Sequence, residues 1–143
     1  MIKCQYTCSI VKNQKMTSRL FCLSLKAPGL AQRVLPGQFV HVRVANGLKP
    51  FFRRPFSIFR ARKTVDILYD VVGLGTRILS EKKKGESIDC LGPLGTSFRL
   101  PPLGTKQVVM IAGGVGVAPF LALTDVLKKK KYKLILLYGA RDQ

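Results

Sequence analysis

Residues 53–58 bring together side chains whose chemistry suits a dinucleotide. Arg53 and Arg54 are followed by Pro55, Phe56 and Ser57, at the start of a strand-like run. A guanidinium binds a diphosphate as a planar fork, and proline keeps the residue before it extended. A serine hydroxyl, or the backbone N–H beside it, could then reach a ring nitrogen of a flavin. Taken alone, the pattern is more typical of an ordinary edge strand of a basic protein, and it gains weight only from two later glycine stretches that fit the same ligand.

A first glycine stretch, Gly73-Leu74-Gly75-Thr76, precedes one or two expected helical turns over residues 77–80. Glycine lets the backbone approach a ligand closely, and a helix start offers unpaired N–H groups and a positive dipole end. Thr76 could cap that helix or give its hydroxyl to a phosphate. The alternative is a strand-to-helix turn that needs glycine only for its dihedral angles.

A second glycine stretch, from Gly113 and Gly114 through Gly116 to Pro119, joins an apolar run to a second pattern typical of a helix. Pro119 occupies the third glycine position of G-x-G-x-x-G, so the dinucleotide fingerprint is incomplete. Phosphate or nicotinamide binding rests on topology rather than on the motif. The elements expected here are a buried strand over 107–112, a helix over 117–127 and a buried strand over 133–138, which form a β-α-β unit.

The residues before this unit read as short strands separated by turns, which indicates a small antiparallel barrel. Residues 92–95 are expected to form a tight turn, and residues 100–104 a linker. We therefore expect two domains, one over 1–100 and a partial one over 105–143. The other expected strands cover residues 5–11, 19–26, 38–44, 64–72 and 87–91.

Composition and net charge limit the classes of binding partner. The 143 residues carry a net charge of +18, which favours anionic ligands such as nucleotide phosphates, an acidic protein or nucleic acid. The lysines are not interleaved with aromatic residues as base-stacking strands require, so nucleic acid is not the favoured partner. The uncharged run 108–123 is shorter than the roughly 20 residues of a membrane span. No apolar signal-peptide segment opens the chain, which favours a cytoplasmic location.

Metal and acid–base chemistry have little support. The four cysteines include no C-x-x-C pair, and His41 is the only histidine. We expect reduced, structural thiols and no metal site. The sequence also offers no paired carboxylates and no nucleophile–base pair, so no catalytic residue is predicted.

Five motifs in this order resemble the ferredoxin-reductase superfamily of flavoproteins. They are R-P-x-S, G-x-G-T, G-P-L-G, G-G-x-G-x-x-P and Y-G-A-R. Within the superfamily the chain is most similar to the electron transfer subunit of NAD-dependent dihydroorotate dehydrogenase, which serves pyrimidine biosynthesis. A hydrogenase-associated or ferredoxin–NADP reductase-like subunit remains an alternative.

The resemblance implies a six-stranded antiparallel FAD-binding barrel, followed by the first β-α-β unit of a truncated nucleotide-binding α/β domain. Arg54 would meet the FAD pyrophosphate, with Gly75 and Thr76 on its other side. Pro55, Phe56 and Ser57 would line the isoalloxazine. The ribityl or adenine part of FAD would lie along the backbone of Leu68, Tyr69 and Asp70. The nicotinamide nucleotide would approach Gly113, Gly114, Gly116 and Pro119, with Gly139, Ala140 and Arg141 near its ribose or phosphate.

Two departures accompany the resemblance. Asp70 would set an anion near a diphosphate, which is unfavourable unless its side chain points away, and alternation alone does not say which face meets the ligand. The chain also stops after one β-α-β unit and lacks the cluster-binding cysteines of the dihydroorotate dehydrogenase subunit. We therefore expect an intact FAD half-site, a crippled nicotinamide site, no iron–sulfur cluster and a chain inactive alone, either truncated or completed by a second chain.

The resemblance implies an electron-transfer function. Such a subunit passes electrons between NAD(P) and a catalytic dehydrogenase subunit in a hetero-oligomer, and the hard chemistry belongs to the flavin. Two other classes remain open. One is a basic β-barrel that binds nucleic acid, and the other is an interaction subunit without flavin whose positive face docks an acidic dehydrogenase.

Overall fold

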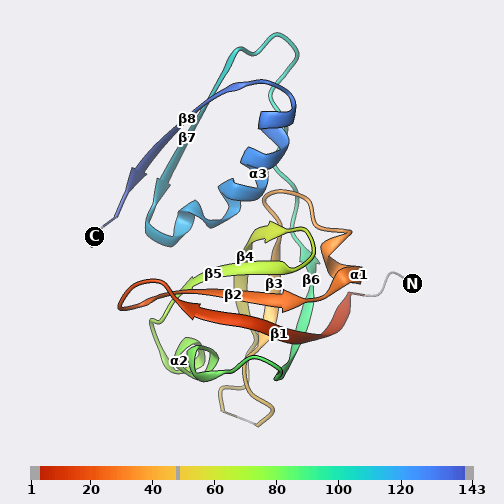
Figure 1. Ribbon diagram of the computed structural model, residues 1–143, viewed down its shortest axis with the longest axis vertical. Helices are drawn as coiled ribbons and strands as arrows, with labels where there is room; N and C mark the ends of the chain where they lie inside the picture. The colour runs from red at the N-terminus through yellow and green to blue at the C-terminus, as the bar shows by residue number, and fades with distance from the viewer. Residues whose placement is uncertain (1–3, 48, 141–143) are drawn as a thin grey trace.

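The computed structural model describes residues 4–47 and 49–140. Its first part contains the strands β1 (Gln5–Lys15), β2 (Leu20–Lys26), β3 (Phe39–Arg43), β4 (Arg54–Ala61), β5 (Val65–Asp70) and β6 (Ser87–Leu94), with the helices α1 (Pro28–Ala31) and α2 (Leu74–Glu81). Its second part contains β7 (Gln107–Gly113), the 3-10 helix η1 (Gly114–Val117), α3 (Ala118–Lys129) and β8 (Lys133–Gly139). The strands of the first part close into an antiparallel barrel in the order β1-β2-β5-β4-β3-β6, and β7 and β8 pair in parallel (Figure 1). The predicted fold class is confirmed.

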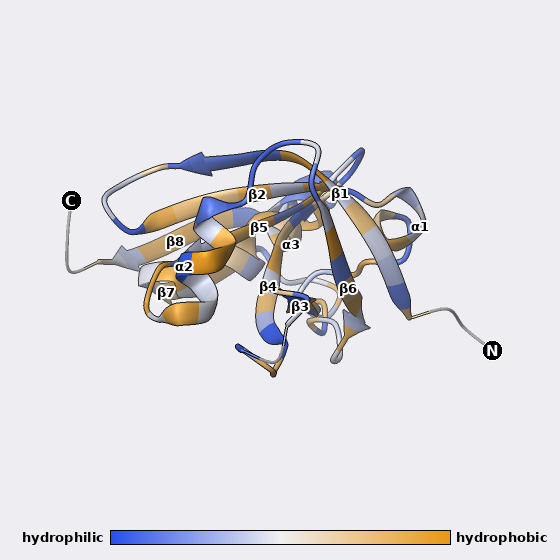
Figure 2. Ribbon diagram, turned by 90° about the horizontal axis from the view of Figure 1, so that it is seen from below, coloured by the Kyte–Doolittle hydropathy of each residue, from blue (hydrophilic) through white to orange (hydrophobic). Residues whose placement is uncertain are grey.

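Alternating side chains explain the barrel. Val65, Ile67 and Tyr69 of β5 point into the interior and are at most 1% exposed, as the sequence pattern predicts. Val40 and Val42 do the same from β3. Hydrophobic residues are accordingly interspersed with hydrophilic ones along the barrel strands (Figure 2). Each aliphatic side chain that is fully buried in this way stabilises the fold by roughly 1.5–3 kcal/mol.

The structure corrects the boundaries of several elements. β1 continues to Lys15, so the turn between β1 and β2 is shorter than expected. Gly92, Pro93 and Leu94 belong to β6 and not to a tight turn, because β6 continues alongside β3, where Leu94 lies opposite Phe39 across an irregular register. Residues 28–31, expected in a loop, form the single turn α1.

The parallel pair has one packed face and one bare face. Met110 of β7 packs against Leu123 and Leu127 of α3. On the other face Val109 and Ile111 are 50% and 73% exposed, although parallel strands are usually covered on both sides. In the described part of the chain, no helix is long and apolar enough to cross a membrane.

The helix α3 attaches this second part to the barrel, where it contacts β4 (Figure 1). Asp125 of α3 accepts a hydrogen bond from Arg62 Nη2 at 2.9 Å, and its Oδ2 lies 3.6 Å from Arg60 Nε. Phe98 adds an apolar link, with its ring centroid 5.8 Å from that of Phe120 in α3. A Cβ at Gly37 of the barrel would lie 2.9 Å from the Phe98 ring, so only glycine leaves room there.

We expect Asp125→Asn to loosen α3 from the barrel, because it removes the charge that both arginines face. The pairs are partly exposed, so global stability should fall by no more than about 1 kcal/mol. Hydrogen exchange should instead become faster in α3 and at the end of β4. Glu81→Gln, which removes one negative charge from the exposed end of α2, is the control. Equal exchange rates in the two variants would show that Asp125 does not hold the helix.

Candidate dinucleotide-binding site

The side chain of Arg54 lies against the first turn of α2. A Cβ built on Gly75 would be 2.6 Å from Arg54 Nε and 3.2 Å from both Cζ and Nη2. The guanidinium can take this place only because residue 75 has no side chain. A second contact fixes its direction, since Arg54 Nη1 donates a 2.7 Å hydrogen bond to the carbonyl oxygen of Phe52. Residues 21 positions apart in the sequence thus meet as the resemblance implies.

The hydroxyl of Thr76 is engaged within its own turn. Its Oγ1 accepts hydrogen bonds from the backbone N–H of Val72 at 2.9 Å and of Gly73 at 3.1 Å. It also lies 3.1 Å from the Gly73 carbonyl oxygen, to which it can donate. The Thr76 side chain therefore caps α2. The features of α2 that can bind an anion are the backbone N–H groups of its first turn and the positive end of the helix dipole.

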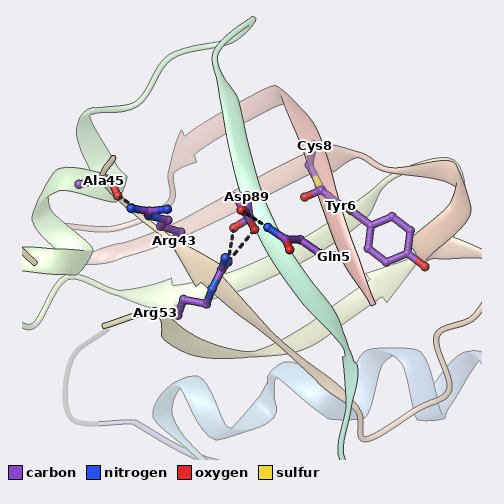
Figure 3. A network of polar contacts seen from close by, with 7 residues as sticks. All are labelled: Gln5, Tyr6, Cys8, Arg43, Ala45, Arg53 and Asp89. Carbon is purple, nitrogen blue, oxygen red and sulfur yellow. Dashed lines mark hydrogen bonds and ion pairs between the residues drawn. The ribbon is translucent and has the colours of Figure 1, made fainter. Parts of the chain in front are cut away.

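Arg53 has a different environment from Arg54. Its Nη1 donates to Asp89 Oδ1 at 2.7 Å and to the Asp89 carbonyl oxygen at 3.2 Å (Figure 3). Gln5 Nε2 donates to the other carboxylate oxygen, Oδ2, at 2.7 Å. The Arg53 guanidinium, followed by the Gln5 amide, holds the pKa of the Asp89 carboxyl below its usual range despite partial burial. Arg53 therefore ties the start of β4 to β6, and Arg54 is the arginine left for a ligand.

The rest of the motif in β4 lies beside β3 and the barrel core. Pro55 is exposed and pairs with His41, and the half-buried Ser57 pairs with Phe39. The half-buried Phe56 packs on the core, with its ring centroid 5.6 Å from that of Tyr69.

Tyr69 can contribute only its backbone to a ligand. Its side chain is 1% exposed, and its hydroxyl donates to Asn13 Oδ1 at 3.0 Å. Burial raises the pKa of this phenol to about 12. The flanking residues Leu68 and Asp70 face outward, into a cleft. The alternation of β5 therefore turns the Asp70 carboxylate toward the space that a ligand could occupy, and not away from it.

That cleft, of about 800 Å³, lies between the barrel and the parallel pair. On the side of the parallel pair, its wall includes Gly113 and Gly114 at the end of β7 and Gly139 and Ala140 at the end of β8. Ligands of open α/β sheets bind at this carboxyl end of the strands. Glycine at these positions leaves backbone groups open to a nucleotide.

Other predicted residues lie elsewhere. Of the part that the structure describes, Gly116 and Pro119 do not line the cleft. Residues 54–57, Gly75 and Thr76 are also outside its lining. Arg141 lies outside the described residues, so its role remains a prediction.

The chain is similar in sequence to known proteins. No protein-family model matches it. It is 41% identical over 126 residues to the dihydroorotate dehydrogenase B (NAD(+)) electron transfer subunit of Desulforamulus reducens, a match that covers 86% of this chain and 48% of the relative. The subunit of the same name from Fusobacterium nucleatum is 32% identical over 136 residues, covering 92% of this chain and 52% of the relative.

Solved structures are also similar to this chain. The NADH-dependent reduced ferredoxin-NADP oxidoreductase matches with a TM-score of 0.85 and 28% identity, over 96% of this chain and 50% of that one. The chain is ferredoxin-reductase-like in sequence and fold. The ferredoxin NADP+ reductase of Neisseria gonorrhoeae with bound FAD and NADP shows the same fold, with a TM-score of 0.79 at 22% identity over 96% of this chain and 58% of that one. This ferredoxin-reductase-like chain spans about half the length of the curated relatives it matches.

One wall of the cleft in this ferredoxin-reductase-like chain was missed by the sequence analysis. The turn between β1 and β2 contributes Thr17, Ser18 and Arg19, with Leu20 at the start of β2. In the sequence Thr17 and Ser18 belong to a polar turn, and Arg19 and Leu20 begin the expected strand over 19–26. They reach the cleft because Leu20 pairs with Asp70 when β2 lies beside β5. Their position at the cleft could be predicted only from the pairing register of β2 and β5.

We expect Arg53→Gln to lower the free energy of unfolding by about 1–2 kcal/mol at neutral pH, because it leaves the partly buried Asp89 carboxylate without its cation. The folded-state pKa of Asp89 is lowered, so the contribution of the pair is fully present above the unfolded value of about 3.9 and is lost as the pH falls through the folded value. Urea unfolding at a series of pH values should therefore show the variant and the wild type converging in acid.

Arg54→Gln is the matched control for this measurement, since it removes the same charge one position along the strand. Among the described residues Arg54 forms no ion pair, so its replacement should change stability by no more than about 0.5 kcal/mol. An equal loss in both variants would mean that net charge, and not the Asp89 contact, explains the effect.

Proposed function

We propose that this chain binds FAD and acts as the flavin-carrying electron-transfer component of an oxidoreductase. The observation that carries the proposal is the position of the Arg54 guanidinium over Gly75 at the start of α2. A fork of N–H donors lies against the first turn of a helix there, and both features favour a diphosphate. Net charge supports the same ligand, since a surplus of +18 attracts nucleotides from solution.

Each predicted residue would have a limited part in holding the cofactor. Arg54 would bind the diphosphate, with the backbone N–H groups of Gly75 and Thr76 opposite. Pro55, Phe56 and Ser57 would position the ring system, with Ser57 near its reactive nitrogen. The backbone of residues 68–70 would follow the ribityl or adenine part.

Bound FAD would supply hydride acceptance and single-electron transfer, and the protein would supply orientation and electrostatics. The glycines at the ends of β7 and β8 would admit a nicotinamide nucleotide, NAD(P), to the cleft. The outlying Gly116 and Pro119 would act by shaping the turn into α3.

The relatives suggest the setting of this chemistry. Those compared above are named electron transfer subunits of dihydroorotate dehydrogenase B. We propose that this chain likewise passes electrons between NAD(P) and a catalytic dehydrogenase subunit in a hetero-oligomer. Another ferredoxin–NADP reductase-like oxidoreductase is the alternative within the same fold.

The direct test is to purify the chain in the presence of FAD, remove free cofactor and record the visible absorbance spectrum and the melting temperature. We expect flavin absorbance that stays with the protein and a melting temperature that rises with FAD concentration, because a ligand that binds only the folded state stabilises it. A colourless protein whose melting temperature does not change with FAD, but which binds oligonucleotides in a salt-dependent manner, would favour a nucleic-acid-binding β-barrel. A colourless protein that binds an acidic dehydrogenase would favour the interaction class.

Two substitutions test the residues that carry the proposal. Arg54→Gln should weaken FAD binding by about 10–100-fold, the range for losing a charge-assisted hydrogen bond. Gly75→Ala should weaken binding through Arg54, because the added methyl group would occupy the place of the guanidinium. Isothermal titration with FAD measures both effects.

Gly73→Ala is the matched control for Gly75→Ala. It adds the same methyl group two residues earlier, where a built Cβ meets nothing within 4 Å. Its FAD affinity should stay within about threefold of the wild type. Equal losses in the two alanine variants would contradict the role given to the Arg54–Gly75 contact.

A further inference from the structure

Arg19 and Asp70 face each other at the wall of the cleft. Arg19 Nη2 lies 3.9 Å from Asp70 Oδ2, and the two side chains are 56% and 27% exposed. Among the described residues that line the cleft, these two are the only Lys, Arg, Asp or Glu side chains. In a protein of net charge +18, this part of the wall is therefore close to neutral.

The fold holds the two residues in this relation. Leu20 pairs with Asp70 in the β2–β5 ladder, and the N–H of Val71 donates a 2.9 Å hydrogen bond to the carbonyl oxygen of Arg19. The turn carrying Arg19 is thus fixed to the end of β5. Five residues after Asp70 the chain reaches Gly75, where Arg54 lies. Asp70 therefore stands on the segment that leads directly to the proposed diphosphate site.

A lone carboxylate at this position would oppose the proposed ligand. Asp70 faces the cleft, and an anion repels a diphosphate over distances of about a Debye length, roughly 10 Å at 0.1 M salt. Arg19 brings the opposite charge to the same place. Its distance of 3.9 Å from Asp70 is long for a hydrogen-bonded pair, and its side chain is more than half exposed, so the pair adds little to folding.

We propose that Arg19 is a positioning residue that cancels the charge of Asp70, so that no unpaired carboxylate on this segment opposes the FAD diphosphate at the Arg54–Gly75 site. This proposal rests on the proposed function. The two residues then act on affinity with opposite signs, and Arg19 matters only while Asp70 carries its charge. A pair that served the fold alone would change stability and leave FAD affinity unaltered.

The test is a double-mutant cycle with FAD as the titrated ligand, followed by flavin fluorescence at low ionic strength. Arg19→Gln should weaken binding about tenfold, the effect of one unpaired charge acting over roughly 10 Å near a protein surface. Asp70→Asn should bind at least as tightly as the wild type. The double variant should return to within about threefold of the wild type, since no charge is left to cancel.

Lys26→Gln is the control, because it removes one positive charge from the exposed far end of the same strand, β2. Urea unfolding of each variant verifies that stability is unchanged. Equal affinities for Arg19→Gln and Lys26→Gln would overturn the proposal, and so would a double variant as weak as Arg19→Gln. These results are distinct from a failure of the proposed function, in which the wild type itself would not bind FAD.

Discussion

Arg54 reaches the first turn of α2 because residue 75 carries no side chain, and the candidate site depends on this contact. Two features that favour an anion, a guanidinium and a helix start, come together from segments 21 residues apart. The barrel makes the meeting possible, since β4 and β5 are neighbours and β5 leads into α2. Any change in their register would separate the two halves of the site.

The neighbouring arginine shows how the same residue type is divided between structure and ligand. Alternation along a strand sends successive side chains to opposite faces, so Arg53 meets Asp89 of β6 whereas Arg54 meets α2. One cation stabilises the barrel and keeps an acidic side chain ionised. The other remains available to an anion. A count of basic residues in this motif would miss that division.

The second part of the chain contributes to the site by position more than by side-chain chemistry. Glycines at the ends of β7 and β8 form one wall of the cleft, and α3 holds this wall against the barrel through Asp125 and the Phe98–Phe120 contact. Val109 and Ile111 are exposed on the other face of the parallel pair. In larger parallel sheets, helices usually cover both faces.

The fold class and the order of the motifs could be predicted from the residues alone, because the alternation of residues 65–69, the apolar runs of the parallel pair and the glycine stretches are all local signals. The sequence also identified Arg54 and Gly75 as candidates. The three-dimensional arrangement was needed to show that Thr76 caps its own helix, that Asp70 faces the cleft and that Arg19 lies opposite Asp70. Those outcomes depend on strand register and on which face of β5 is buried, and both are set by packing between segments far apart in the chain.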